Sequence, residues 1–327
     1  MASERQLINR VIRRFPPPSK GGELRVAIGD DAAVLRPRAG AEWVVTTDAF
    51  LENVHFLRKI HPPKAAGYKA LARATSDIAA MGARPRYFFL TLGLPDACSG
   101  AWLDGFLGGM ARAARRFGLT LAGGDTTKYL VVVASLTVLG ETERGKAVLR
   151  SGARPGDLLC VSGRLGEAEL GLRLIQKKSH RRGPWRTLLK KHLYPEPRLK
   201  LGEWLAARRF ATSMIDTSDG LSTDLGHICE ASGVGAKVWA SKIPAVKIPE
   251  ELQSLGLDLV ELALHGGEDY ELLFTVPKKL AGRLPRKAGD VPIAIIGEIT
   301  SHKGIMLVGA GGLEKPLLPG GWDPFRK

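Results

Sequence analysis

The sequence has few cysteines, few aromatic residues and no long hydrophobic run. Its 327 residues include three cysteines, Cys98, Cys160 and Cys229, none in CxxC spacing, which argues against a disulfide framework and a structural zinc site. Aromatic residues make up 6% of the chain. The longest nearly unbroken apolar stretch, residues 129–139, is shorter than the ~18 residues that a membrane helix needs. We therefore expect no membrane span and a reducing, cytoplasmic environment.

Several sequence signals are also absent. Residues 1–5 contain no apolar segment and no small-residue cleavage site, so we expect no secretory signal. The chain has no GxxxxGKS/T motif and no HRD or DFG motif, which excludes a P-loop NTPase and a protein kinase. No GxGxxG follows a predicted strand, which argues against a Rossmann dinucleotide site. Length and ordinary globular composition predict two domains.

The charge balance is strongly basic. The chain carries 48 Lys and Arg against 33 acids, a net charge of +15, and this raises the question of nucleic acid or an anionic substrate. Basic residues concentrate in segment 177–200, which is either a solvated linker or a surface that attracts an anion. Nucleic-acid modules usually interleave aromatic with basic residues, and aromatic residues are scarce here. The composition therefore argues against a nucleic-acid partner.

Short β-rich runs alternate with longer helical runs, as in α/β or α+β proteins. In the first half, helices are predicted at residues 64–81 and 104–116, ending at Gly82 and Gly118. The strands predicted in the same half are 24–28, 42–46, 87–92, 119–122 and 130–139.

A turn rich in glycine and proline, residues 150–157, marks the expected boundary between a domain of residues 1–149 and one of residues 150–327. The helix from about Asp219 has Ser218 as its expected N-cap and Gly233 as its end. The other elements predicted in this half are strands 158–161, one ending at Asp216, 271–276 and 293–299, helices 166–175 and 199–207, and a glycine-rich tail.

Aspartates occur in five short motifs next to glycine, serine or threonine. Acids at strand ends converge on one edge of a sheet, where their repulsion requires cations. Oxygen ligands without paired His or Cys select a hard ion such as Mg²⁺. The pattern predicts a metal–nucleotide site, with the alternative that each aspartate caps a helix or turns a loop. The motifs are Ile28–Asp31, Thr46–Asp48, Ser76–Asp77, Gly123–Thr127 and Asp216–Gly220.

Two of these motifs are informative by themselves. Asp77 follows Ala74 by three residues on an alanine-rich helix, where an unpaired buried carboxylate is costly, so it either faces solvent or binds something positive. In segment 123–127, glycines allow backbone N–H groups to approach an anion.

The order of these motifs resembles the thiamine-monophosphate kinase family, from about residue 28 to the C-terminal Gly-Gly-Trp-Asp. Strings such as TSDIAAMGA also occur in the wider superfamily of aminoimidazole ribonucleotide synthetase and selenophosphate synthetase. The strings that carry the resemblance are IGDDAAVL (28–35), TTDAFLENVHF (46–56), KALARATSDIAAMGARPRYFFLTLGLP (69–95), LAGGDTTK (121–128), RSGARPGD (150–157), DTSDGLSTDLGHICEASGVGA (216–236) and LHGGEDYELLFT (264–275).

The resemblance implies a two-domain α/β fold of the aminoimidazole ribonucleotide synthetase type. The N-terminal sheets of two subunits would pair into a barrel, giving a homodimer. The implied reaction converts ATP and thiamine monophosphate into ADP and thiamine diphosphate, by direct Mg²⁺-assisted in-line transfer of the γ-phosphoryl. The first domain would bind metal and ATP and dimerise, and the second would complete the ATP and substrate sites.

The resemblance also implies roles for individual residues. The implied Mg²⁺ ligands are Asp30, Asp31, Thr46, Thr47, Asp48, Asp77, Asp125, Asp216 and Asp219. The implied ATP contacts are Gly124, Asp125, Arg150 and Ser218, and the implied thiamine monophosphate contacts are His55, Glu268 and Trp322. Such a site is rich in metal ligands and poor in nucleophiles because phosphoryl transfer depends on positioning and charge neutralisation.

The three substrate residues have structural alternatives. His55 is either a structural histidine or a donor to the substrate phosphate, and Glu268 either forms a salt bridge or attracts the cationic ring. Trp322 either anchors the tail or offers an aromatic face to that ring. Segment 50–53 and His265 depart from the family pattern beside these residues, which bears on substrate affinity.

Two other functions stay open from sequence. One keeps the fold and cyclises a formylglycinamidine ribonucleotide through transient phosphorylation. The other is a basic nucleic-acid-binding or scaffold protein with a vestigial ATP site. Selenophosphate synthetase is disfavoured because the first cysteine is Cys98.

Overall fold

The computed structural model describes residues 4–16, 23–27, 32–176, 186–248 and 256–325. The chain divides into two compact units, the first made of residues 1–78 and 83–147 and the second of residues 79–82 and 148–327. The expected division at residue 150 lies close to this boundary. None of the helices among the described residues is long and apolar enough to cross a membrane.

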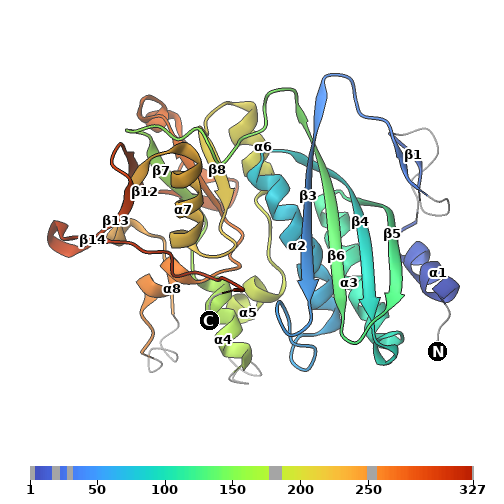
Figure 1. Cartoon of the computed structure of the whole chain (residues 1–327). Coiled ribbons are helices and arrows are strands. Elements are labelled where there is room, and N and C mark those ends of the chain that lie inside the picture. The colour runs from blue at the N-terminus through green and yellow to red at the C-terminus, as the bar shows by residue number, and fades with distance from the viewer. Residues whose placement is uncertain (1–3, 17–22, 28–31, 177–185, 249–255, 326–327) are drawn as a thin grey trace. The chain divides into compact units, whose positions relative to one another are not determined.

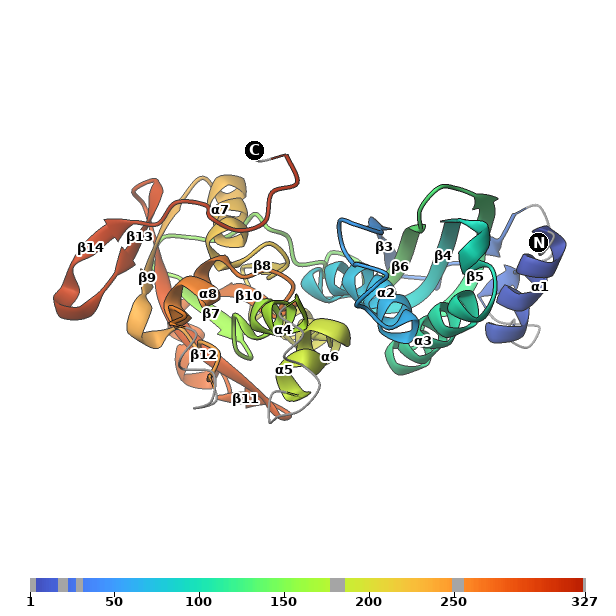
Figure 2. The ribbon, with the colours of Figure 1, turned by 90° about the horizontal axis from the view of Figure 1, so that it is seen from below.

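Unit 1 is a four-stranded sheet in the order β3-β6-β4-β5, in which β4 and β5 are parallel and the other pairs antiparallel. Helices α2 and α3 cover one face of this sheet (Figures 1 and 2). Its elements are α1 (Glu4–Arg14), β1 (Leu24–Val26), β2 (Val34–Leu35), β3 (Ala41–Leu51), α2 (Pro63–Ala80), β4 (Arg84–Leu94), η1 (Asp96–Cys98), α3 (Ala101–Phe117), β5 (Thr120–Lys128) and β6 (Val133–Glu143).

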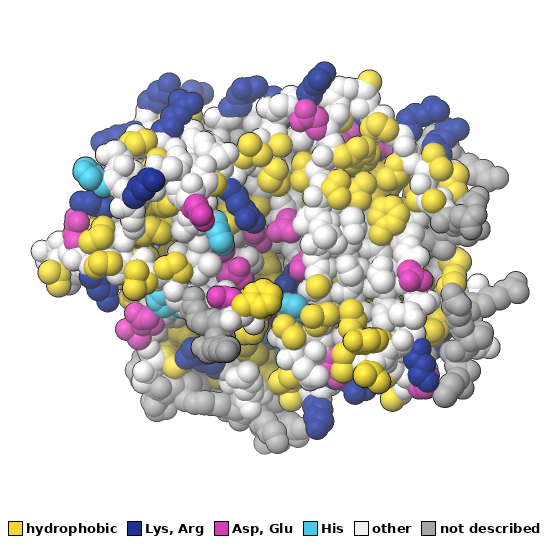
Figure 3. Space-filling model, in the orientation of Figure 1, with side chains coloured by type: hydrophobic (Ala, Val, Ile, Leu, Met, Phe, Trp, Pro, Cys, Tyr) yellow, Lys and Arg dark blue, Asp and Glu magenta, His cyan; other side chains and the backbone are white. Residues whose placement is uncertain are grey.

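Alternation along β6 separates the two faces of the sheet. Ala134, Leu136 and Val138 are fully buried beneath the helices, because every second side chain of a strand points to the same face. On the other face, Val45 of β3 is 59% exposed. Figure 3 shows this face, on which hydrophobic and uncharged side chains outnumber charged ones. Unit 1 therefore has an apolar layer on one side of its sheet and an open face on the other.

Unit 2 contains an eight-stranded sheet in the order β14-β13-β9-β12-β7-β10-β8, with β11 paired to β12. Only β9 and β13 pair in parallel among the neighbouring strands described. Its elements are β7 (Leu158–Ser162), α4 (Glu167–Gln176), α5 (Arg186–Leu193), α6 (Leu199–Ala207), β8 (Ser213–Asp216), α7 (Leu221–Ser232), β9 (Gly235–Trp239), η3 (Ala240–Lys242), α8 (Leu259–His265), β10 (Leu272–Val276), η5 (Lys278–Arg283), β11 (Lys287–Ala288), β12 (Val291–Thr300), β13 (Gly304–Val308), η6 (Ala310–Gly312) and β14 (Glu314–Pro316).

Two hydrophobic clusters hold this sheet between helices. Residues of α7 and α8, such as Leu225 and Leu264, pack with Leu273 of β10. On the opposite face, Leu205 of α6 packs with Phe274 of β10. Adjacent residues of β10 thus face opposite layers, and both faces of the strand are buried.

Most of the predicted elements are confirmed within a few residues. Gly118 and Gly233 end α3 and α7 with φ of 74° and 68°, as expected for glycine in the left-handed region. The predicted glycine-rich tail also contains two strands that were not predicted, because residues 304–308 and 314–316 form β13 and β14. Their glycines lie at the ends of these strands and in the connecting η6 turn.

Candidate active site

A polar cluster in unit 1 joins β3 to α2. Thr46 and Asp48 are two residues apart on β3, so their side chains face the same side of the sheet. The Thr46 hydroxyl donates to Asp77 Oδ2 over 2.5 Å, and Arg73 Nε lies 3.3 Å from Asp48 Oδ2. Asp77 is half-buried and accepts this hydroxyl bond. Three of the residues expected to hold metal therefore lie in one cluster.

Thr47 and Asp125 lie outside this cluster. The Thr47 hydroxyl is 3.2 Å from the hydroxyl of Thr137, on the open face of the sheet. Asp125 is exposed on β5, where its Oδ1 accepts a hydrogen bond from the Thr126 N–H over 2.8 Å. Residues 123–125 thus belong to a strand, and a Cβ at Gly124 would overlap the Leu90 carbonyl. Gly124 is needed here for close packing of two strands.

The aspartates of unit 1 do not form a single site within the described chain. Strands β3 and β5 are opposite edges of the sheet, and three strand spacings separate them by about 14 Å. Asp48 and Asp125 of one chain are therefore too far apart to bind the same ion. Asp30 and Asp31 lie outside the described residues. Among the residues that are described, no three His, Cys, Asp or Glu side chains lie close enough to hold a metal.

His55 is held in a turn after β3. The Leu51 N–H donates to His55 Nδ1 over 3.0 Å, so a neutral imidazole carries its proton on Nε2. The ring stacks on Phe50, with centroids 6.0 Å apart and planes 15° apart. Asn53 has a left-handed φ of 70°, which closes the turn. The geometry makes Nε2–H the donor of His55.

Sequence reasoning missed the residues that support this turn. The buried carboxylate of Glu52 lies 2.8 Å from Arg58 Nε and accepts the Val132 N–H over 3.0 Å. These contacts tie the turn after β3 to the segment before β6. The partners are up to 80 residues apart in the chain, so spacing alone gave no signal for them.

In unit 2, Asp216 is the last residue of β8, and the loop between β8 and α7 carries Ser218 and Asp219. The predicted N-cap role of Ser218 is wrong, because α7 begins after Gly220, which has a φ of 112°. Asp224 of the first turn takes the N–H groups of Asp219 and Gly220 at 3.3 and 3.0 Å. Burial, together with the negative charges of Asp216 and Asp219, raises the pKa of Asp224 well above its ordinary value. A cation held by Asp216 and Asp219 would relieve this repulsion.

Glu268 and Trp322 lie against this same loop. The Glu268 N–H donates to the Ser218 carbonyl over 2.8 Å, and the Trp322 N–H donates to the Asp219 carbonyl over 2.9 Å. A Cβ at Gly321 would overlap that Asp219 carbonyl, so glycine permits the C-terminal segment to approach. Trp322 is 52% exposed. Two predicted substrate residues and one predicted ATP residue therefore meet at a single loop.

Arg150 is exposed at the start of unit 2, and its carbonyl accepts a hydrogen bond from the Ser232 hydroxyl over 3.3 Å. Ser232 is the last residue of α7. This contact ties the backbone at Arg150 to the C-terminal end of the helix that the aspartate loop precedes.

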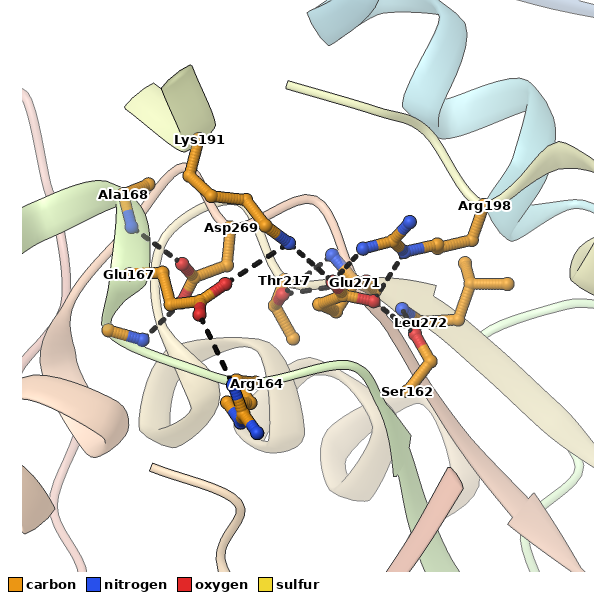
Figure 4. Close-up of polar contacts among 11 residues, drawn as sticks. Ser162, Arg164, Glu167, Ala168, Lys191, Arg198, Thr217, Asp269, Glu271 and Leu272 are labelled. Atoms are coloured by element: carbon orange, nitrogen blue, oxygen red, sulfur yellow. Dashed lines mark hydrogen bonds and ion pairs between the residues drawn. The ribbon is translucent and has the colours of Figure 1, made fainter. Parts of the chain in front are cut away.

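A buried ionic network lies directly after Glu268 (Figure 4). Glu271 is fully buried, and its carboxylate accepts hydrogen bonds from Arg198 through Nε, at 2.6 Å, and Nη2, and from the Ser162 hydroxyl at 2.6 Å. Lys191 Nζ lies 3.7 Å from the same carboxylate. Two cations of the basic segment thus pair with a buried acid, so Lys191 and Arg198 are not part of a solvated linker.

Asp269 anchors the start of α4. Its two oxygens accept the N–H groups of Gly166 and Ala168 at 2.6 and 3.0 Å, as a carboxylate does at a helix N-terminus. Burial raises the pKa of Asp269 to about 7. Sequence reasoning singled out Glu268 in this segment and missed Asp269 and Glu271, although three acids within four residues were a visible signal.

The chain matches two family profiles: AIR synthase related protein, N-terminal domain, over residues 29–142, and its C-terminal domain over residues 154–309. Thiamine-monophosphate kinase of Escherichia coli strain K12 is 39% identical over 287 residues, which cover 85% of this chain and 85% of that protein. The chain belongs to the thiamine-monophosphate kinase family.

Solved structures of thiamine-monophosphate kinases share the fold. The crystal structure from Stenotrophomonas maltophilia K279a has a TM-score of 0.81 at 37% identity, covering 94% of this chain and 96% of that chain. AaThiL complexed with AMPPCP and TMP has a TM-score of 0.78 at 31% identity, covering 98% and 97%. The predicted family and its two-domain α/β fold are confirmed.

Proposed function

We propose that the protein transfers the γ-phosphoryl of ATP to thiamine monophosphate, giving thiamine diphosphate and ADP. The observation that carries the proposal is the meeting of Ser218, Glu268 and Trp322 at the loop after β8, in a chain of this family. A related enzyme has been solved with AMPPCP and TMP together. A site for two phosphate compounds fits the chain's acidic motifs, which would hold cations between the phosphates, and its net positive charge, which attracts anions.

Oxygen donors suit a hard divalent ion such as Mg²⁺ better than a soft metal ion. Thr46, Asp48 and Asp77 offer such donors in unit 1. Asp216 and Asp219 offer them in unit 2, where their negative charges contribute to the raised pKa of Asp224. We assign these residues, together with Thr47, Asp125, Asp30 and Asp31, to holding Mg²⁺. When bound, Mg²⁺ would neutralise charge on the phosphates that must approach each other.

The remaining predicted residues would bind and orient the two substrates. Gly124, Asp125, Arg150 and Ser218 would contact ATP. His55 would donate from Nε2–H to the acceptor phosphate, because the Leu51 N–H occupies its Nδ1. The Glu268 carboxylate and the Trp322 ring would attract the cationic thiamine ring, through charge and through cation–π contact.

The proposed site requires a second copy of the chain. Asp48 and Asp125 lie on β3 and β5, the two edge strands of the sheet in unit 1. Pairing two sheets into a barrel would place β3 of one copy beside β5 of its partner. The exposed Val45 and the scarcity of charged side chains on the open face support burial of this surface. We therefore propose a homodimer, acting in the cytoplasm, where the free, buried thiols of all three cysteines are stable.

A charged side chain on the open face tests the dimer. We expect Val45→Glu to give a monomer by light scattering and to lower turnover strongly, while Leu313→Glu, at an exposed position of unit 2, leaves both unchanged. A dimeric and fully active Val45→Glu variant would contradict the proposed barrel.

Substrate choice tests the proposed reaction. We expect ADP release with MgATP and thiamine monophosphate, and none above background with formylglycinamidine ribonucleotide. ADP release with MgATP and formylglycinamidine ribonucleotide, but not with MgATP and thiamine monophosphate, would instead support the cyclising alternative.

A further inference from the structure

The segment from α5 to α6 contacts two acids of the segment 268–271, Glu268 and Glu271. Lys191 and Arg198 lie beside Glu271, and His192 Nδ1 lies 3.3 Å from Glu268 Oε2. Helix α5 itself packs closely on α4, where a Cβ at Gly171 would crowd the backbone of Leu188 and the side chain of His192. The position of His192 is thus fixed by packing of its own helix.

Glu268 is the acid of this segment that reaches solvent. Its side chain is 25% exposed, whereas Glu271 is fully buried and Asp269 is 8% exposed. Its backbone has a φ of 66°, an uncommon conformation for a residue with a side chain. Such a conformation persists where surrounding contacts enforce it, and it occurs often at ligand sites.

Contacts on both sides enforce the backbone of Glu268. Its own N–H and that of Tyr270 donate to the Ser218 and Thr217 carbonyls at 2.8 and 2.9 Å. Asp269 is anchored on α4 by two backbone N–H groups. The backbone is therefore determined without His192, and the contact of His192 is with the carboxylate.

We infer that His192 is a positioning residue, which holds the Glu268 carboxylate in the orientation that binds the cationic ring of thiamine monophosphate. The inference rests on the proposed function of Glu268. The His192 ring is 1% exposed, so water does not compete for its Nδ1. A glutamate side chain loses considerable rotamer freedom when it is ordered, and the imidazole orders it before substrate arrives.

Three substitutions at His192 separate orientation from packing. An asparagine amide nitrogen lies near the position of the histidine Nδ1, a glutamine amide nitrogen lies near that of Nε2, and leucine has no donor. We expect His192→Leu and His192→Gln to raise the KM for thiamine monophosphate about tenfold, equivalent to ~1.4 kcal/mol. We expect His192→Asn to restore it to within about threefold of the wild type, and the KM for ATP to stay within about twofold in all three.

A matched control is available in unit 1. His61 is also buried, at 4% exposure, and its Nδ1 lies 3.0 Å from the Leu57 N–H. His61→Leu removes a buried imidazole of the same kind without touching Glu268. We expect it to leave the KM for thiamine monophosphate unchanged.

The variant Glu268→Gln separates a failure of the proposed substrate role of Glu268 from a failure of the inference about His192. We expect it to raise the KM for thiamine monophosphate at least about tenfold, and His192→Leu to add less than about twofold in that background, because the histidine acts through the carboxylate. An unchanged KM in Glu268→Gln would show that the proposed substrate role of Glu268 is wrong. Two results would overturn only the inference about His192, provided that Glu268→Gln does raise the KM for thiamine monophosphate. One is equal KM values for His192→Asn and His192→Gln. The other is an effect of His192→Leu on the KM that is as large in the Glu268→Gln background as in the wild type.

Discussion

Replacing Arg198 with methionine should strongly destabilise unit 2. Arg198 donates two hydrogen bonds to Glu271, whose side chain has no exposed surface. Methionine fills similar volume and leaves the Glu271 carboxylate buried with its guanidinium partner removed. Breaking a buried ion pair on one side costs about 3–5 kcal/mol, because the remaining charge stays desolvated. Lys191 Nζ lies 3.7 Å from this carboxylate and is partly exposed, so it compensates the charge only in part.

Arg173 provides a solvent-exposed control with a similar Nε contact. Its Nε lies 2.7 Å from Glu169 Oε1, against 2.6 Å for Arg198 and Glu271, but both side chains of this pair reach solvent. We expect Arg173→Met to cost less than about 1 kcal/mol. The contrast tests burial together with the second hydrogen bond, from Nη2, that Arg198 makes to its acid, since the Nε contact is nearly identical in the two pairs.

Hydrogen exchange read by mass spectrometry measures the effect in unit 2 separately from unit 1. We expect Arg198→Met to speed exchange in β7 and β10, which the Glu271 network joins. We also expect it to lower the urea concentration at which half of the protection in these strands is lost. Adding Glu271→Gln should recover part of the loss, because no buried charge then remains. Equal costs for Arg198→Met and Arg173→Met, or no recovery in the double variant, would refute the reasoning.

Three further predictions concern single residues. Asp269 has a pKa raised to about 7 in the folded state and one near 3.9 in the unfolded state, so the unfolded state loses its proton first as pH rises. Urea midpoints should therefore show the wild type losing stability relative to Asp269→Asn between about pH 4 and 7. A parallel pH dependence of the two proteins would contradict this. Asp125→Asn should lower kcat at least about a hundredfold with an unchanged melting temperature, because the side chain is exposed and bonds only its neighbour's N–H among the contacts described; near-normal turnover would remove Asp125 from the site. Trp322→Ala should raise the KM for thiamine monophosphate about threefold and leave that for ATP unchanged, as expected for a half-exposed cation–π contact; equal changes in both constants would indicate a structural role for the ring.

Elements set by local pattern were predictable from the sequence. Helix α2 follows from alanine-rich spacing, and the ends of α3 and α7 follow from Gly118 and Gly233, because each signal lies within a few residues of the element it sets. The strands β13 and β14 were missed, since short glycine-flanked runs resemble loops until a neighbouring strand supplies hydrogen bonds.

The candidate site was only partly predictable for the same reason. Motifs identified Thr46, Asp77 and Glu268 by residue type, but their contacts depend on segments 31 to 76 residues away in the chain. The supporting residue Asp224 was hidden because a serine before a helix is the usual cap, whereas the cap position here is Gly220 and the Asp224 carboxylate accepts the N–H groups of Asp219 and Gly220 before the helix.

The most direct test of the central claim is phosphorus NMR of the purified protein with MgATP and thiamine monophosphate. The account predicts that thiamine diphosphate and ADP appear in equal amounts, with no free phosphate beyond the background of an Asp125→Asn sample. Untouched ATP, or ATP converted only to ADP and free phosphate, would contradict phosphoryl transfer to thiamine monophosphate and the substrate roles of His55, Glu268 and Trp322.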